Sequence, residues 1–222
     1  ILYTVFTALD FTQPYDPVFV KYACVVLCFA VACVSAILSR GKKDAIFLAL
    51  ALGFTVISDL FIFVINDFYE VGLATFIVAQ SLYFCRLYIG RKRWYISLSV
   101  RVAVAAVAVG VALAKLGGGL LIAEVGIYIT MLVANLVDAL ILCRRGWRFI
   151  LFAIGLFLFV CCDICVGLFN FGKVLNVQIP LALYNFAKYG MWAFYVPSQV
   201  CIVLSGRRIK GKKNERKAEE NS

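Results

Sequence analysis

The sequence contains no histidine, and only 15% of its 222 residues are charged. Without histidine a Ser-His-Asp triad is excluded, and a metal site would lack its commonest protein ligand. A chain with 64% hydrophobic residues and so little charge has too few polar side chains to cover a water-soluble domain. The composition therefore indicates an integral membrane protein.

The nine cysteines do not indicate a disulfide framework or a metal centre. Their number is odd, and nearly all lie within apolar runs, where cysteine behaves as a small hydrophobic residue. Cys162 and Cys165 form a C-x-x-C motif, but no second such motif completes a set of ligands. The glycine run 117–119 lacks the Lys-Ser/Thr of a phosphate-binding loop. We expect no metal and no cofactor.

Apolar runs of roughly 20 residues, the length that crosses a bilayer, recur along the chain. They predict helices over 18–39, 45–65, 70–90, 95–115, 119–143, 148–169 and 180–205. We therefore expect an all-α fold, a polytopic transmembrane helix bundle that forms one domain over residues 1–205. It has seven spans, or eight if the opening segment is a further one. That segment has no basic region or small-residue cleavage site, so we expect no signal peptide.

Basic residues fall in alternate connections between the expected helices. The basic connections are RGKKD at 40–44, GRKRW at 90–94 and RRGWR at 144–148, and the C-terminal tail is also basic. The positive-inside rule then predicts a cytoplasmic C-terminus, in what we expect to be a bacterial cell membrane. We expect the tail, 206–222, to be disordered and to bind anionic lipid headgroups, not nucleic acid.

Two aspartates lie at matching positions inside the expected spans, where a charge costs about 2.5–3.5 kcal/mol at a helix centre. Asp59 is on the second span and Asp163 on the sixth, each some six residues before the outer end. Because these spans run in the same direction, both carboxyl groups are expected roughly 9 Å below the outer boundary. Two neighbouring carboxyls in a low-dielectric site share protons, so that one is neutral and one ionised. We interpret them as an acid/base pair.

Other polar side chains are expected to face the same interior. The fifth expected span carries a set at helical spacing, which places them on one face: Glu124, Tyr128, Met131, Asn135 and Asp138. The other spans add Lys21, Gln80, Tyr83, Tyr184, Lys188, Tyr195 and Gln199. Together these residues predict a polar chamber inside the bundle that opens outward. We interpret Arg101 and Asp138 instead as a structural pair between adjacent spans.

At 53–84 the sequence reads GFTVISDLFIFVINDFYEVGLATFIVAQSLYF. This run resembles the signature G-x-x-x-S-x-x-G-D-x-x-L … F-x-x-G-x-x-x-F-x-x-x-H-x-x-Y of the YhhN family, the lysoplasmalogenases and their eukaryotic transmembrane relatives. Ser58 and Asp59 stand for its Gly-Asp. The later positions are matched by Phe68, Gly72, Phe76 and Tyr83. Gln80 stands where the family has histidine, and glutamine forms hydrogen bonds but carries no proton at neutral pH.

The second half of the chain resembles the same family. GLFLFVCCDICVGLFNF at 155–171 is similar to its G-x-x-x-F-x-x-S-D-x-x-L span, and FYVPSQVCIVLSG at 194–206 to its closing Y-Y-x-x-Q segment. Lys21 and the pair Tyr128 and Met131 lie where the family tends to have a lysine and a Tyr-Met pair. The resemblance thus covers most of the chain.

The resemblance implies hydrolysis of the vinyl-ether bond of a lysoplasmalogen, a lipid substrate, to a fatty aldehyde and a glycerophospho-headgroup. Protonating the vinyl ether and capturing the resulting cation with water requires an acid and a nearby anion or base. Asp59 and Asp163 would jointly supply these roles, and Lys188 or Lys21 would contact the phosphate. The substrate-binding set is Lys21, Gln80, Tyr83, Glu124, Tyr128, Lys188, Tyr195 and Gln199.

Two other classes use the same residues differently. A non-catalytic binding or transport protein would hold a lipid or small polar solute in the chamber, and the weak similarity between the two halves would reflect a transporter repeat. A retinal protein would form a Schiff base with Lys188 in the last span. Aldehyde release from a lysoplasmalogen separates the enzyme from the transporter, and a visible absorption band after adding retinal identifies the third class.

Overall fold

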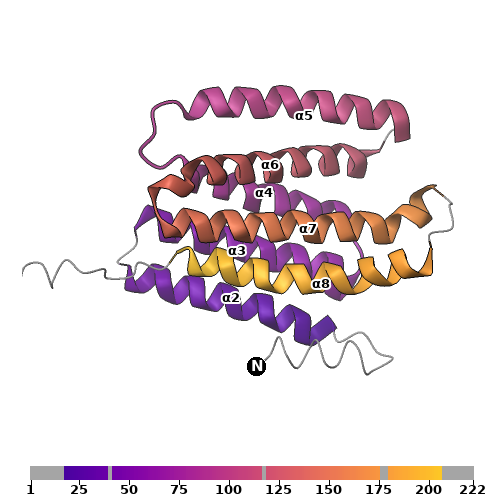
Figure 1. Ribbon diagram of the computed structural model, residues 1–222, viewed down its shortest axis with the longest axis horizontal. Helices are drawn as coiled ribbons and strands as arrows, with labels where there is room; N and C mark the ends of the chain where they lie inside the picture. The colour runs from indigo at the N-terminus through magenta and orange to yellow at the C-terminus, as the bar shows by residue number, and fades with distance from the viewer. Residues whose placement is uncertain (1–17, 40–41, 117–118, 176–179, 207–222) are drawn as a thin grey trace, which may run out of the picture.

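The computed structural model describes residues 18–39, 42–116, 119–175 and 180–206, and their long helices lie side by side in a bundle (Figure 1). The helices are α2 (Val18–Leu38), α3 (Lys43–Asp59), α4 (Tyr69–Leu87), α5 (Trp94–Leu116), α6 (Leu120–Leu142), α7 (Trp147–Leu175) and α8 (Leu181–Leu204). Two short helical segments, η1 (Leu60–Ile65) and η2 (Cys143–Arg145), follow α3 and α6. No strand occurs among these residues, so the all-α prediction is confirmed.

The helix boundaries lie close to those expected from the apolar runs. Helix α3 and η1 together end at the expected residue 65, and the largest difference is at the end of α7, which continues to Leu175 although the sequence predicts an end at 169. No proline lies between the start of α7 and Pro180, so the helical hydrogen bonding can continue. The predictions for the opening segment and for the basic tail, apart from Gly206, fall outside the described residues.

Five helical stretches are long and apolar enough to cross a membrane: Val18–Leu38, Lys43–Ile65, Trp94–Lys115, Leu120–Arg145 and Trp147–Asn170. Helices α4 and α8 are not among them, because both carry more polar side chains. The predicted total of seven to eight spans is therefore not confirmed. The apolar surface of the outer helices is nevertheless extensive, and on α5 it includes the exposed residues Val100, Val102, Val104, Val107 and Val111.

The packing order places α5 at the edge of the bundle. Helix α7 packs along α8 and α6, α3 packs against α2 and α4, and α4 packs against α6. Helix α5 contacts mainly α6 and lies at the top of Figure 1. Its only buried side chain among the described positions is that of Arg101, whereas the apolar core is built from the other six helices.

A partly buried ionic network joins four helices at the end where α3 begins. Arg86 on α4 donates to Asp44 on α3 (Nε to Oδ1, 3.0 Å) and to the Ser205 hydroxyl after α8 (Nη1 to Oγ, 2.9 Å). Arg148 on α7 also donates to Asp44 and to the Ser205 carbonyl oxygen. One carboxylate therefore faces two guanidinium groups, and this end of the bundle keeps a positive surplus. The basic connections between the helices lie at this same end of the bundle. That this end faces the cytoplasm remains a prediction.

Candidate functional site

Both predicted aspartates accept a hydrogen bond from a tyrosine of another helix. The Tyr195 hydroxyl on α8 donates to Asp59 Oδ2 on α3 (2.5 Å), and the Tyr128 hydroxyl on α6 donates to Asp163 Oδ2 on α7 (2.7 Å). Both carboxyl groups lie within electrostatic range of Tyr128 and of Cys162. The fold therefore brings two carboxyl–phenol pairs from four helices into one part of the interior.

A chain of aromatic rings connects the two pairs. Tyr128 packs against Phe76 with 5.6 Å between ring centroids, Phe76 lies 5.9 Å from Phe159, and Phe159 lies 5.4 Å from Tyr195. These rings place apolar surface between the two pairs and pack against both phenols. Hydrogen bonds and charges act more strongly in such surroundings than in water.

The two aspartates differ in exposure. Asp59 is only 1% exposed, and its Oδ1 has no hydrogen-bond partner among the described residues. Asp163 is partly exposed. One carboxyl is thus enclosed with a spare acceptor atom, whereas the other belongs to a residue that keeps part of its accessible surface.

An unusual helix end fixes the position of Asp59. At Asp59 the α-helix widens into the π-helical turn η1, and π segments occur often at functional sites. The chain then reverses through Asn66 and Phe68, both with a positive φ (56° and 54°). The neighbouring Ser58 hydroxyl donates to the Gly72 carbonyl oxygen (2.5 Å), which ties this helix end to the first turn of α4.

Gly72 allows this close approach of α4 to η1. A Cβ at Gly72 would lie 2.6 Å from Ile62 Cγ1. Gly72→Ala is therefore expected to lower the free energy of unfolding by about 1–3 kcal/mol, the usual cost of overpacking, measured by thermal unfolding of the purified protein. Gly110→Ala on exposed α5, where nothing lies within 4 Å of the added Cβ, is the control. Equal unfolding temperatures for the two variants would show that the contact is not restrictive.

Lys21 lies next to this cluster and is 1% exposed. Its Nζ is 4.7 Å from the centroid of the Trp192 ring, and Trp192 packs against Tyr195 at 5.8 Å. A small cavity of about 10 Å³ borders the same rings and is lined by Phe63, Cys162, Val166, Met191, Trp192 and Tyr195. Lys21 is thus the interior lysine nearest to the Asp59–Tyr195 pair along this chain of contacts.

A second polar network crosses from α4 to α5 and includes Gln80. The Gln80 side-chain oxygen accepts from Asn135 Nδ2 (2.9 Å), and Asn135 Oδ1 accepts from Arg101 Nη1 (2.8 Å). Arg101 Nη2 donates to Asp138 Oδ2 (2.5 Å), the ion pair interpreted from the sequence as structural. Gln80 Nε2 has no partner within the described part of the chain, although the residue is fully buried.

Tyr83 and Gln199 are also fully buried in this interior. Tyr83 lies within electrostatic range of Asp59 and packs on Phe152 at 5.4 Å. Gln199 donates to Ser198 Oγ (3.4 Å), and its side-chain oxygen has no partner among the described residues. The predicted polar interior therefore exists as a packed set of side chains, bordered by a small cavity and not by a wide chamber.

Three predicted residues lie away from this set. Lys188 is exposed on α8, with its Nζ 5.7 Å from the centroid of the Tyr189 ring. Tyr184 stacks on Phe169 at 4.9 Å. Glu124 is partly buried near Glu70, at the start of α4. The exposed position of Lys188 does not suit a buried Schiff base.

Trp192 and Phe159 are residues of this site that the sequence reasoning did not single out. Trp192 precedes Tyr195 by three residues, which puts both on one face of α8, so helical spacing could have found it. Phe159 lies four residues before Asp163, so helical spacing could have identified it in the same way. Within the described ranges no cluster of three or more histidine, cysteine, aspartate or glutamate side chains could hold a metal ion.

Long apolar helices around buried carboxyl–phenol pairs define a helical protein of the integral membrane class. The YhhN family model matches residues 17–206, and the chain belongs to this family. The resemblance found in the sequence is thereby confirmed. No curated protein and no solved structure matches the chain.

Proposed function

We propose that the protein is a membrane hydrolase of the lysoplasmalogenase type, which cleaves the vinyl-ether bond of a lysoplasmalogen to a fatty aldehyde and a glycerophospho-headgroup. The observation that carries the proposal is the pair of carboxyl groups, each held by a buried tyrosine, that lie within electrostatic range of the same phenol, Tyr128. Membership of the YhhN family supports this choice of reaction.

The reaction uses one carboxyl as acid and the other as base. The acid donates its proton to the β-carbon of the vinyl ether, which leaves an oxocarbenium ion at the carbon bound to oxygen. The other carboxylate stabilises this cation and takes a proton from water as the water oxygen bonds to that carbon. The hemiacetal then loses its hydroxyl proton, its bond to the glycerol oxygen breaks, and that oxygen is protonated. The products are the aldehyde and the alcohol.

Asp59 and Asp163 perform these steps jointly, and Tyr195 and Tyr128 orient them. The small cavity lined by Phe63, Met191 and Trp192 lies beside Tyr195 and has the apolar walls that an alkenyl chain requires. It is too small for a lipid in this conformation, so binding requires the surrounding side chains to move apart. Lys21, which contacts Trp192, is better placed than exposed Lys188 to meet the substrate phosphate.

The test compares a lysoplasmalogen with its saturated ether analogue. The purified protein, in detergent or in nanodiscs, is incubated with each lipid, and aldehyde release is followed over time. We expect aldehyde from the vinyl ether and none from the saturated ether, because only the vinyl group can be protonated at carbon. If no aldehyde forms between about pH 5 and 8, where carboxyl pairs of this kind change protonation, the hydrolase proposal fails and the binding or transport function is favoured.

A further inference from the structure

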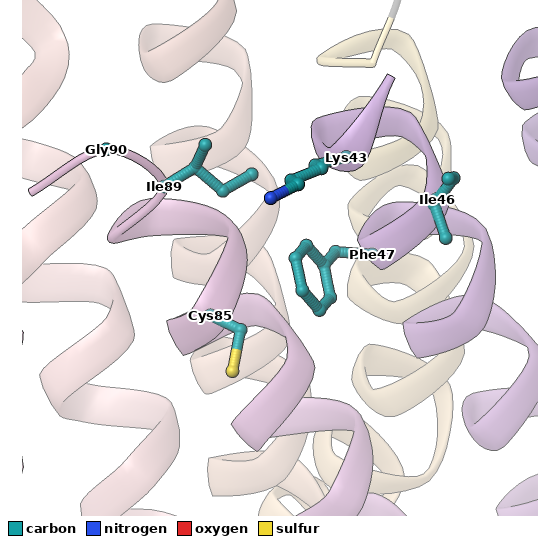
Figure 2. Close-up of a pocket in the computed structure, with 6 residues that line it drawn as sticks. All are labelled: Lys43, Ile46, Phe47, Cys85, Ile89 and Gly90. Carbon is teal, nitrogen blue, oxygen red and sulfur yellow. The ribbon is translucent and has the colours of Figure 1, made fainter. Parts of the chain in front are cut away.

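A groove lies between α3 and α4 at the basic end of the bundle. Its walls are Lys43, Ile46 and Phe47 from α3, and Cys85, Ile89 and Gly90 from the end of α4 and the turn after it (Figure 2). These six residues define what we call the α3–α4 groove. It contains about 670 Å³ of open space, part of which is continuous with the surroundings.

The groove has apolar walls and a single cation. Ile46, Phe47 and Ile89 present side chains that suit a hydrocarbon chain, and the thiol of Cys85 is exposed between them. In Figure 2 the Lys43 side chain extends across the gap from α3 toward Ile89. An ammonium group at the mouth of an apolar groove matches a molecule with an anionic head and a hydrocarbon tail.

The charge on Lys43 is not neutralised by its acidic neighbour. Asp44 is engaged by Arg86 (3.0 Å) and by Arg148, and Lys43 has no ion pair within the described part of the chain. A further cation, Lys42, directly precedes α3. Gly90, with a φ of +74°, turns the chain after α4, and the basic run 91–93 that follows is not part of the groove walls. An anion bound here would therefore meet an excess of positive charge.

The groove is separate from the aspartate site. Lys43 and Asp59 are the first and last residues of α3, 17 residues long, so the two sites lie roughly 24 Å apart along the helix. A lipid in the groove would thus occupy the opposite end of the bundle from the carboxyl pair. The inference does not rest on the proposed hydrolysis.

We propose that the α3–α4 groove binds an anionic phospholipid, with its phosphate at Lys43 and one acyl chain along Phe47 and Ile89. Basic side chains at a membrane surface attract anionic lipids, and one that contacts the headgroup directly contributes enough to change affinity about fivefold. The apolar walls add contacts with one acyl chain, so the groove can hold a single lipid molecule and not only attract anionic lipids in general. The headgroup contributes charge and the chain contributes buried apolar surface.

The test is native mass spectrometry of the purified full chain, titrated with phosphatidylglycerol or with phosphatidylcholine of identical acyl chains. We expect one phosphatidylglycerol to be retained in preference to phosphatidylcholine. Lys43→Gln removes the charge and is expected to weaken this binding about fivefold. Cys85→Trp fills the groove without changing its charge and is expected to abolish retention of the preferred molecule.

Lys92→Gln is the matched control, because it removes an exposed cation from the same end but outside the groove walls. It should change binding by less than about twofold, as expected when screened surface charges act only from a distance. Equal losses for Lys43→Gln and Lys92→Gln would overturn the proposal and show a diffuse attraction. Full retention by Cys85→Trp would also overturn it. Glycerol phosphate, which has no acyl chain, should not compete with phosphatidylglycerol. If it does compete, the groove binds phosphate without a contribution from the acyl chain, which contradicts the proposal.

Discussion

Replacing Asp59 or Asp163 with asparagine is expected to reduce aldehyde release from a lysoplasmalogen by at least about 100-fold. Loss of a general acid or base typically costs 10²–10⁴-fold in rate, and asparagine can neither give nor take the proton. The amide keeps the size of the carboxyl group and an oxygen that accepts a hydrogen bond. Tyr195 and Tyr128 can therefore keep their partners, and both variants should remain folded in the membrane.

Asp67→Asn is the matched control for these two variants. Asp67 lies in the exposed turn between η1 and α4, where its Oδ1 accepts from the Phe68 amide, an interaction that asparagine can keep. Its activity should stay within about twofold of that of the original protein, as for surface substitutions generally. Initial rates at saturating lipid and the unfolding temperature are measured for all three. An aspartate variant that folds normally and keeps more than a third of the activity would place the proton chemistry on other residues.

The tyrosine partners explain why two carboxyl groups can be kept in this interior. An isolated charge in an apolar core is very costly, whereas a hydrogen-bonded carboxyl loses much less on leaving water. Tyr195 and Tyr128 supply these bonds from α8 and α6, and Phe159 packs against Tyr195. The phenols therefore belong to the proposed site even if neither transfers a proton.

The sequence predicted the helices well because their signal is local. A run of about 20 apolar residues is visible without knowing its neighbours. Five helices end within a few residues of the expected positions, and α3 together with η1 ends at the expected residue 65. The π-helical turn η1 was not predicted, because Leu60–Ile65 has the same apolar composition as an α-helix. In the folded protein Ser58 and Gly72 hold α4 close against this turn, a contact between segments that composition does not reveal.

The pairing of side chains between helices was less accessible to prediction. Depth along a helix follows from counting residues, so Asp59 and Asp163 could be expected at a common level. Rotation about the helix axis depends on packing, and the partners Tyr195 and Tyr128 emerge only from the folded arrangement. Lys188 was expected inside, but the rotation of α8 buries its neighbour Ala187 and leaves Lys188 exposed.

Arg101→Met is expected to give the largest loss of stability. Arg101 is 3% exposed, and it is the one buried side chain that α5 contributes within the described residues. It donates to Asp138 (2.5 Å) and to Asn135 (2.8 Å), both on α6. Removing one partner of a buried ion pair typically costs 3–5 kcal/mol, because the other charge is left uncompensated. We expect about 3 kcal/mol here, since Asp138 is partly exposed and its side chain retains 17% of its accessible surface.

The double variant Arg101→Met/Asp138→Leu separates two contributions to this loss. One is the unpaired carboxylate of Asp138, and the other is the loss of the remaining contacts of the arginine. If the cost comes mainly from an unpaired carboxylate, removing Asp138 as well should recover more than half of the lost free energy of unfolding. The free energies of unfolding of the single and the double variant are measured on purified protein in the same detergent. If the double variant is no more stable than Arg101→Met, the arginine acts through its bond to Asn135 and its contact with Phe84, whose ring centroid lies 4.6 Å from Cζ. Because Asn135 also holds Gln80, that result would make α5 part of the support for the interior polar site.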